Sequence, residues 1–255
     1  MKTNINQEKV WNRVSKAWDR HRQKPWKDVE EMMNFLIHQQ ASKHSMQLPD
    51  SKHSMQLPDS KHSMQLPDSK HSMQLSGRIL DIGCGNCRNL LDFAKQGFEC
   101  YGIDFSEEML KHADEFAKKN NIKIKLKKAR AENLPFNDNS FDYVLCVAVL
   151  HHLRKKEQIK ALKEILRALK PEGRALITVW NNLNPKFWKF LLKKETFIPW
   201  KINDKTYQRY YYFFSFYKLR SLLKKAGFKV VKQSSPFARN LIFIVKKPVV
   251  VRKNY

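Results

Sequence analysis

The sequence lacks any apolar run long enough to cross a membrane. The longest such run, residues 143–150, is far below the roughly 20 residues that a spanning helix needs. Residues 1–10 also lack the apolar segment of a secretory leader. We therefore expect a soluble, cytoplasmic protein that has no membrane among its partners.

Cysteine is also scarce, with only four in 255 residues, which excludes a disulfide scaffold. Cys84 and Cys87 have the spacing of a redox or zinc motif. No second close pair of cysteines or histidines completes a tetrahedral metal site, so we expect no metal centre. The spacing leaves a disulfide between these two cysteines open.

Acidic residues are few, because 24 Asp and Glu stand against 49 Lys and Arg and give a formal net charge of +25. Such an excess predicts a polyanionic partner, either nucleic acid or an acidic membrane surface. A general lysine-rich bias of the proteome is the alternative explanation. The length allows one or two domains, and we interpret the chain as one α/β domain with additions.

The most informative stretch is an apolar strand, residues 79–82, that runs into a turn with Gly83 and Gly85. An amphipathic helix follows through residues 90–93, which makes the first half of a βαβ unit. Glycine adopts positive φ without a Cβ penalty and lets a ligand lie against bare backbone. This pattern predicts a nucleoside site.

The next strand, residues 98–103, ends on Asp104, about 20 residues beyond the glycines, where a carboxylate can accept both ribose hydroxyls. Dinucleotide sites need a third glycine at the position of Arg88, for close packing and for pyrophosphate. A nucleoside without phosphate is therefore favoured over NAD or FAD.

These residues resemble the first motif of class I S-adenosylmethionine-dependent methyltransferases, with Cys87 in place of its third glycine. The segment around residues 129–136 is similar to the adenine-contacting segment of that family, with Arg130 where an acidic residue is usual. The resemblance implies a Rossmann-like α/β fold with a seven-stranded, mostly parallel sheet, an antiparallel last strand and flanking helices. It implies S-adenosylmethionine as cofactor, bound by Asp81, Gly83, Gly85, Asp104, Ala131, Glu132 and Ala148.

The domain organisation follows from the composition along the chain. Residues 1–41 have the spacing of two helices, and residues 42–76 form a tandem repeat of Ser-Lys-His-Ser-Met-Gln-Leu-Pro-Asp, which we interpret as a linker. Residues 77–255 form the methyltransferase-like domain. Within it, residues 183–214 interleave aromatic and basic side chains, which suits either an RNA-binding insertion or an amphipathic cover over the sheet.

Two further features point to interactions. Apolar and lysine residues alternate from Ile122 to Lys127, which predicts an edge strand that is either guarded by its lysines or open to a partner's strand. His151 and His152 follow a buried strand at its carboxyl end, where open parallel sheets bind their ligands, so we expect them to contact substrate.

Several separated segments are similar to one subfamily, the tRNA methyltransferases that esterify carboxymethyluridine at the wobble position. These segments are residues 22–26, 83–90, 148–152, 175–180, 209–212 and 239–240. The resemblance implies tRNA as substrate and a small zinc-binding activator protein, for which the strand Ile122–Lys127 is the candidate docking edge. Because a carboxylate substrate needs donors around it, we predict that Arg22, His152 and Arg239 hold it.

Two other functions remain open on the sequence. One is a class I methyltransferase for a small molecule such as a quinone or lipid precursor. The other is a catalytically silent RNA-binding subunit that retains the fold, suggested by Cys87 and Arg130.

Overall fold

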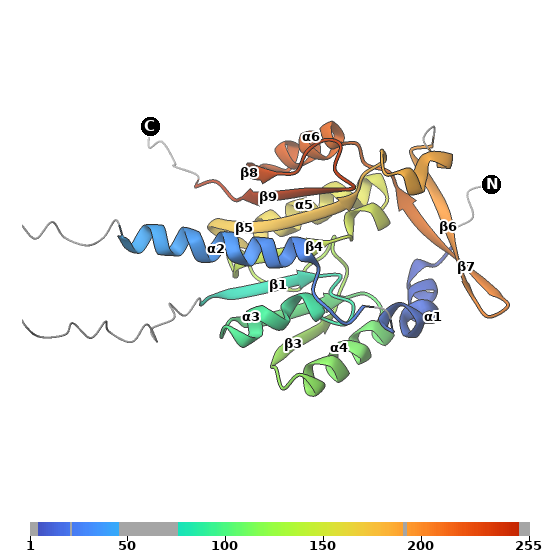
Figure 1. Cartoon of the computed structure of the whole chain (residues 1–255), viewed down its shortest axis with the longest axis horizontal. Helices are drawn as coiled ribbons and strands as arrows, with labels where there is room; N and C mark the ends of the chain where they lie inside the picture. Colours follow the sequence, from blue (N-terminus) through green and yellow to red (C-terminus); the bar gives the residue numbers. More distant parts are fainter. Residues whose placement is uncertain (1–4, 21, 46–75, 191–192, 250–255) are drawn as a thin grey trace, which may run out of the picture.

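The computed structural model describes residues 5–20, 22–45, 76–190 and 193–249. Its centre is a seven-stranded sheet in the order β3-β2-β1-β4-β5-β9-β8 (Figure 1). The pairs among β1 to β5 are parallel, whereas β9 runs antiparallel to β5 and β8. The strands are β1 (Arg78–Ile82), β2 (Glu99–Asp104), β3 (Ile124–Lys128), β4 (Phe141–Val147), β5 (Leu169–Trp180), β8 (Lys229–Gln233) and β9 (Asn240–Lys246). The predicted fold class, including the antiparallel last strand, is confirmed.

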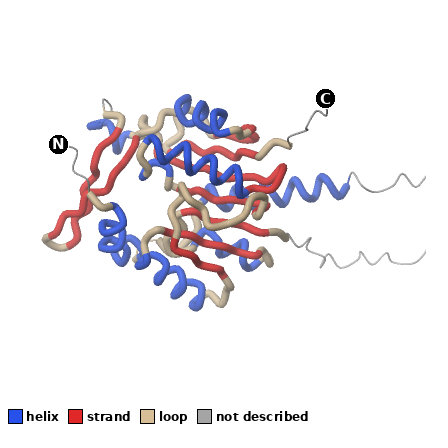
Figure 2. Tube along the Cα trace, turned by 180° about the vertical axis from the view of Figure 1, so that it is seen from behind, coloured by secondary structure: helices blue, strands red, loops and turns tan. Residues whose placement is uncertain are grey.

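Helices cover both faces of this sheet, as Figures 1 and 2 show from opposite sides. Successive side chains of a strand point to opposite faces, so Leu80 and Val144 pack in one apolar core and Ile79 and Leu145 in the other. The first core includes α5 (Lys155–Ala168) and α6 (Phe216–Ala226), and the second includes α2 (Lys27–Ser45), α3 (Leu91–Lys95) and a residue of α4 (Glu107–Lys119). The sheet is therefore the middle of three layers.

The helix ends follow local capping chemistry. The Ser106 hydroxyl accepts the backbone N–H of Met109 and begins α4, and Ser215 begins α6 in the same way. Gly227 ends α6 with φ 104°, a conformation that suits glycine.

A small hairpin stands beside the sheet. Strands β6 (Glu195–Ile202) and β7 (Lys205–Tyr212) pair antiparallel, after the short 3₁₀ helix η3 (Pro185–Phe190). The aromatic residues Tyr210 to Tyr212 are buried, whereas Trp188 is 61% exposed. The basic aromatic segment 183–214 therefore covers the sheet with its second strand and exposes aromatic surface at its start.

Helix α1 (Gln7–Asp19) bridges this hairpin and the sheet. The Gln7 side chain accepts the backbone N–H of Tyr210 at 2.9 Å and donates to the carbonyl of Gln208 at 3.3 Å. On the other side, the Ser106 hydroxyl donates to Asn12 at 2.6 Å. Helix α1 thereby fastens the hairpin to the start of α4, over the carboxyl ends of the strands.

Some predicted boundaries shift. Strand β3 begins at Ile124 rather than Ile122, and α2 continues to Ser45, past the boundary drawn at residue 41. The rest of the tandem repeat, residues 46–75, lies outside the described residues. All four cysteines are buried free thiols. In the part of the chain that the structure describes, no helix is both long and apolar enough to span a membrane.

Candidate active site

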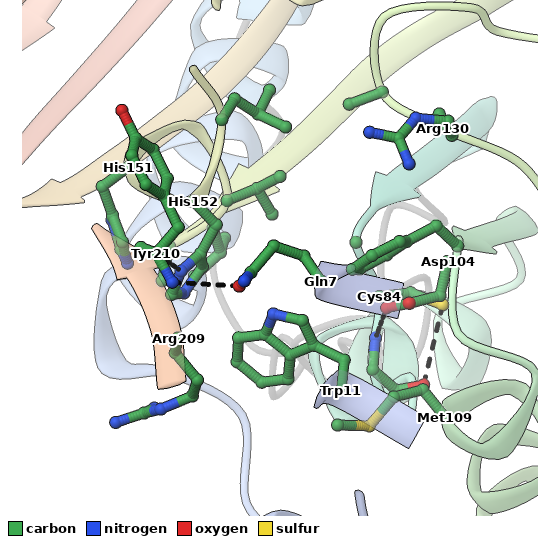
Figure 3. Close-up of a pocket in the computed structure, with 18 of the residues that line it drawn as sticks. Gln7, Trp11, Cys84, Asp104, Met109, Arg130, His151, His152, Arg209 and Tyr210 are labelled. Atoms are coloured by element: carbon green, nitrogen blue, oxygen red, sulfur yellow. Dashed lines mark hydrogen bonds between the residues drawn. The ribbon is translucent and has the colours of Figure 1, made fainter. Parts of the chain in front are cut away.

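A cavity of about 500 Å³ opens at the carboxyl ends of β1, β2 and β4 (Figure 3). Helix α1 and strand β7 close its other sides, and the 3₁₀ helix η2 (Leu150–His152) lies at its base. An open parallel sheet presents loop residues and strand ends together at this edge, so a ligand site there is expected.

The glycine turn forms one wall of the cavity. Gly83 and Gly85 have φ of 64° and 55°, in the left-handed region. A Cβ on Gly83 would lie 2.6 Å from a methyl carbon of Val149, and one on Gly85 would lie 2.7 Å from the Trp18 ring. Both positions therefore require glycine. Cys87 adopts a φ of 63° in the same turn although it carries a side chain, which is buried.

Asp104 lies at the end of β2 and faces the cavity, as predicted (Figure 3). Its Oδ2 accepts the backbone N–H of Gly85 at 3.1 Å and its Oδ1 accepts that of Ser106 at 2.9 Å. Burial raises the pKa of this carboxyl to about 6, against the lowering effect of these donors. Each oxygen keeps a further lone pair for a ligand hydroxyl.

Asp81 does not line the cavity, although the sequence predicts a cofactor contact. Its side chain is buried behind Arg88 and Asn89, which do line the cavity. Burial raises the pKa of Asp81 to about 8, while the charge of Arg88 acts in the opposite direction. Asp81 therefore does not contact a ligand in the cavity directly, and it acts on one only by way of Arg88 and Asn89.

Asp81→Asn is expected to stabilise the protein at pH 8 and to change its stability little at pH 4. The folded pKa lies above the ordinary value of 3.8, so the stability contributed by the bound proton is lost as pH rises from about 4 to 8. Each pH unit in this window corresponds to about 1.4 kcal/mol at most. Melting temperatures of both proteins across this range test the expectation, with the exposed Asp204→Asn as control. A pH-independent difference between Asp81→Asn and wild type would contradict it.

The predicted adenine segment lies along another wall. Arg130, Ala131 and Glu132 all line the cavity, and the Arg130 side chain pairs with Glu132. Ala148 lies beyond β4 with a φ of 59°, and its backbone N–H is bonded to the carbonyl and hydroxyl of Thr178 at 3.0 and 3.1 Å. The Ala148 N–H therefore already has its hydrogen-bond acceptors, but Ala148 still lines the cavity and can contact a ligand there.

Two arginines meet on the opposite side of the cavity. The guanidinium carbons of Arg22 and Arg209 lie 5.6 and 4.3 Å from the ring centre of Trp200, and Arg22 also lies 5.0 Å from that of Trp18. Burial lowers the pKa of both arginines. No carboxylate among the described residues forms an ion pair with either one, and Nε of the buried Arg209 has no hydrogen-bond partner there.

His152 lines the cavity as a neutral ring. Its Nδ1 lies 3.0 Å from the carbonyl oxygen of Tyr210, which can only accept, so Nδ1 carries the proton. Burial lowers the pKa of His152 to about 3, which leaves Nε2 unprotonated at neutral pH. With Nδ1–H bonded to Tyr210, Nε2 has no proton to donate to a carboxylate at neutral pH, which corrects the expectation that His152 is a donor there; the surroundings of the ring are apolar and also include Arg209.

His151 is fully buried against two aromatic rings, whose own centres lie 4.9 Å apart. Trp180 and Tyr211 stack on it with ring centres 4.9 and 5.4 Å away. Neither of its ring nitrogens has a hydrogen-bond partner among the described residues, and burial holds its pKa well below the usual range. His151 therefore belongs to an aromatic stack at the base of the cavity.

Arg239 is not brought together with the other predicted residues. Its side chain is exposed and does not line the cavity, and its carbonyl accepts hydrogen bonds from Asn181 and Asn184. Arg209 occupies the place beside Arg22 that the sequence analysis assigned to Arg239. The similarity of residues 209–212 to the subfamily was the signal in the sequence that could have identified Arg209. The position of this residue, however, depends on a hairpin that folds back onto α1.

The chain was compared with proteins of known sequence. Residues 80–177 match a family described as "Methyltransferase domain". The putative methyltransferase ECU09_1500 of Encephalitozoon cuniculi is 32% identical over 60% of this chain and 70% of its own length. The chain belongs to the methyltransferase family.

Other relatives match this methyltransferase over shorter segments. The uncharacterized methyltransferase YcgJ of Bacillus subtilis is 38% identical over 39% of each chain. The ubiquinone biosynthesis O-methyltransferase of Rickettsia akari is 30% identical over 48% of this chain and 47% of its own length. The chain therefore spans less than half the length of these two relatives.

Solved structures confirm the fold. A protein of Methanosarcina mazei described as SAM-dependent methyltransferase covers 73% of this chain and 99% of its own, at 22% identity and a TM-score of 0.59. A putative methyltransferase solved in complex with the Haloferax volcanii Trm112 methyltransferase activator covers 68% of this chain and 84% of its own, at 18% identity and a TM-score of 0.54.

S-adenosylmethionine is the cofactor of this methyltransferase, and the cavity fits it. The volume of about 500 Å³ lies within the usual range of roughly 300–1,000 Å³ for small-ligand sites. Asp104 offers lone pairs where a ribose would lie, the two glycines leave the backbone bare, and Ala131 and Glu132 border the adenine side. The cofactor, when bound, supplies a methyl group on a sulfonium.

Proposed function

We propose that this methyltransferase esterifies the carboxymethyl group of the wobble uridine in tRNA. The observation that carries the proposal is the pair of the buried Arg209 and the half-buried Arg22 at the cavity, neither with a carboxylate partner among the described residues. A guanidinium that has lost water without gaining an anion is costly, and a carboxylate from the substrate would supply that anion.

The chemistry asks little of the protein beyond positioning. A carboxylate is ionised at neutral pH, so it attacks a sulfonium methyl without a general base. Arg22 and Arg209 would hold the carboxylate, and the rings of Trp18 and Trp200 keep the two guanidinium groups oriented. The aromatic walls formed by Trp11 and Tyr211 would limit hydration of the anion.

The remainder of the chain favours a polyanionic substrate. The net charge is +25, and Lys193, Lys194, Lys201 and Lys205 are exposed on or beside the hairpin that carries Arg209. Contacts with RNA phosphates would fix the substrate, while the arginine pair would read its carboxylate.

Labelled cofactor offered with two pools of tRNA tests this function. One pool comes from cells that make carboxymethyluridine and the other from cells that lack it. We expect methyl labelling of the first pool only, as a base-labile ester. Equal labelling of both pools, or labelling of neither, would contradict the assignment.

The proposal includes an activator protein bound at β3. This strand pairs only with β2 and forms one edge of the sheet, with Ile124 and Leu126 partly buried between exposed lysines. The putative methyltransferase of similar fold was solved in complex with the Haloferax volcanii activator. Addition of a partner's strand would satisfy the open edge.

Purified protein is expected to transfer methyl groups to tRNA slowly and to be stimulated at least severalfold by a purified small zinc-binding activator of the host. The comparison is between initial rates with and without that protein, at equal enzyme concentration. If the chain alone is soluble and as fast as in host extract, the activator proposal fails.

A second candidate function is O-methylation of a small phenol, as the name of the Rickettsia akari relative suggests. The unprotonated Nε2 of His152 favours it, because a neutral imidazole can take the proton of a hydroxyl nucleophile. Labelling of a quinol precursor but of no tRNA would select this candidate.

A further inference from the structure

A second cavity, of about 540 Å³, lies next to the first and is strongly basic. Its charged lining residues are Arg20, Arg22, Lys24 and Arg88, and no carboxylate of the described part of the chain lines it. Arg22, Trp26 and Arg88 border both cavities. We call this second site the loop cavity, because Arg20 and residues 22–26 form most of it.

The loop cavity is held by hydrogen bonds from the residues after the glycine turn. The Asn86 side chain donates to the carbonyl of Arg22 and to Asp19, both at 2.7 Å, and Asn89 accepts the backbone N–H of Trp26 at 3.2 Å. The loop is thus fastened at both ends. The carboxylate of Asp19, at one end of the loop, already accepts hydrogen bonds from Asn86 and Gln23.

Arg88 gives the loop cavity an internal positive charge. Its side chain is 5% exposed, its guanidinium lies over the Trp18 ring, and its Nε has no hydrogen-bond partner among the described residues. Burial lowers the pKa of Arg88 to about 10, and the neighbouring acids Asp81 and Asp19 offset this effect only in part. An anion bound in the loop cavity would offset this buried positive charge.

We infer that the loop cavity binds a phosphodiester of the RNA backbone adjacent to the target nucleotide. This inference rests on the proposed function, since it takes the carboxymethyl nucleotide to occupy the first cavity. Arg22 borders both cavities. The phosphate backbone of a nucleotide bound in the first cavity would therefore pass next to the four cations of the loop cavity. Guanidinium groups match the geometry of phosphate oxygens, and such contacts set the register of an RNA on its protein.

Charge-neutral variants of the outer cations test the inference. Arg20→Gln with Lys24→Gln removes two charges from the loop cavity, and Arg13→Gln with Lys16→Gln removes two exposed charges of α1 that lie in neither cavity. The probe is an anticodon stem-loop with carboxymethyluridine at the wobble position. We expect the first variant to raise its Kd and KM about tenfold and to lower the salt slope by about 0.7 per lost contact, and the control to change Kd less than twofold.

A neutral methylphosphonate placed at each phosphate flanking the wobble nucleotide identifies the contact. At one of the two positions, it should weaken binding to the wild type about tenfold and add almost nothing in Arg20→Gln/Lys24→Gln. Equal losses in both proteins at both positions would overturn the phosphate site, as would equal Kd values for the loop-cavity variant and its control.

Failure of this site and failure of the proposed function give different results. If the stem-loop is methylated but the loop-cavity variant binds it as tightly as the control does, the phosphate site is wrong and the function stands. If no RNA is methylated but binding depends on the loop cavity and on one phosphate, the site stands as an RNA contact and the wobble assignment is wrong. Melting temperatures confirm that each variant is folded.

Discussion

Arg209→Gln is expected to lower kcat/KM for methyl transfer to carboxymethyluridine tRNA by roughly 30- to 3,000-fold. Removing one partner of a buried charge pair costs about 2–5 kcal/mol, and 1.4 kcal/mol corresponds to tenfold. Arg209 lies 4.3 Å from the Trp200 ring centre, is 8% exposed and lines the cavity beside Arg22. The loss should therefore exceed that from any exposed arginine. Steady-state kinetics with labelled cofactor measure it.

Arg239→Gln is the matched control, because the sequence predicts a catalytic role for Arg239 whereas the structure has it exposed and outside the cavity. We expect less than a threefold change. Arg209→Lys should restore part of the activity, since it keeps the charge and loses the planar fork. Cofactor affinity should stay unchanged in all three variants. A larger loss in Arg239→Gln than in Arg209→Gln would overturn the assignment of the carboxylate to Arg22 and Arg209.

The contrast between Arg209 and Arg239 shows which features of the site a sequence pattern can predict. The glycine turn and Asp104 were predictable because their chemistry is local: two glycines that need positive φ follow one strand, and a carboxylate ends the next. The position of Arg209 depends instead on how β7 folds back and on the hydrogen bonds that Gln7 makes to it. Those contacts join residues about 200 positions apart, and no short-range pattern encodes them.

The protonation state of His152 could not be predicted from the sequence, for a different reason. His152 follows a central strand at the place where ligand contacts occur, and its position was predictable. Its neutrality results from burial and from the Tyr210 carbonyl, which belongs to the distant hairpin. Asp81 is similar: the motif identified the residue, but burial behind Arg88 and Asn89 determines that it acts through neighbours.

Asp104→Asn is expected to weaken S-adenosylmethionine binding roughly 30- to 150-fold, because a buried hydrogen-bond pair to a charged acceptor contributes on the order of 2–3 kcal/mol. The backbone N–H groups of Gly85 and Ser106 point at the two carboxylate oxygens, at 3.1 and 2.9 Å. An asparagine amide would present its own N–H donors to one of them. Calorimetric titration of both proteins at pH 7.5 measures the change, with the exposed Glu107→Gln as control.

The dependence on pH identifies the carboxylate independently of any mutation. Burial raises the pKa of Asp104 to about 6 in the free protein, and a ribose would bind the ionised form. Protonation therefore competes with the cofactor as pH falls, so Kd should rise about tenfold per pH unit below 6 and level off above it. In Asp104→Asn this acid limb should disappear, since the side chain no longer titrates. An unchanged acid limb in the variant would show that another group controls cofactor binding and that the ribose lies elsewhere.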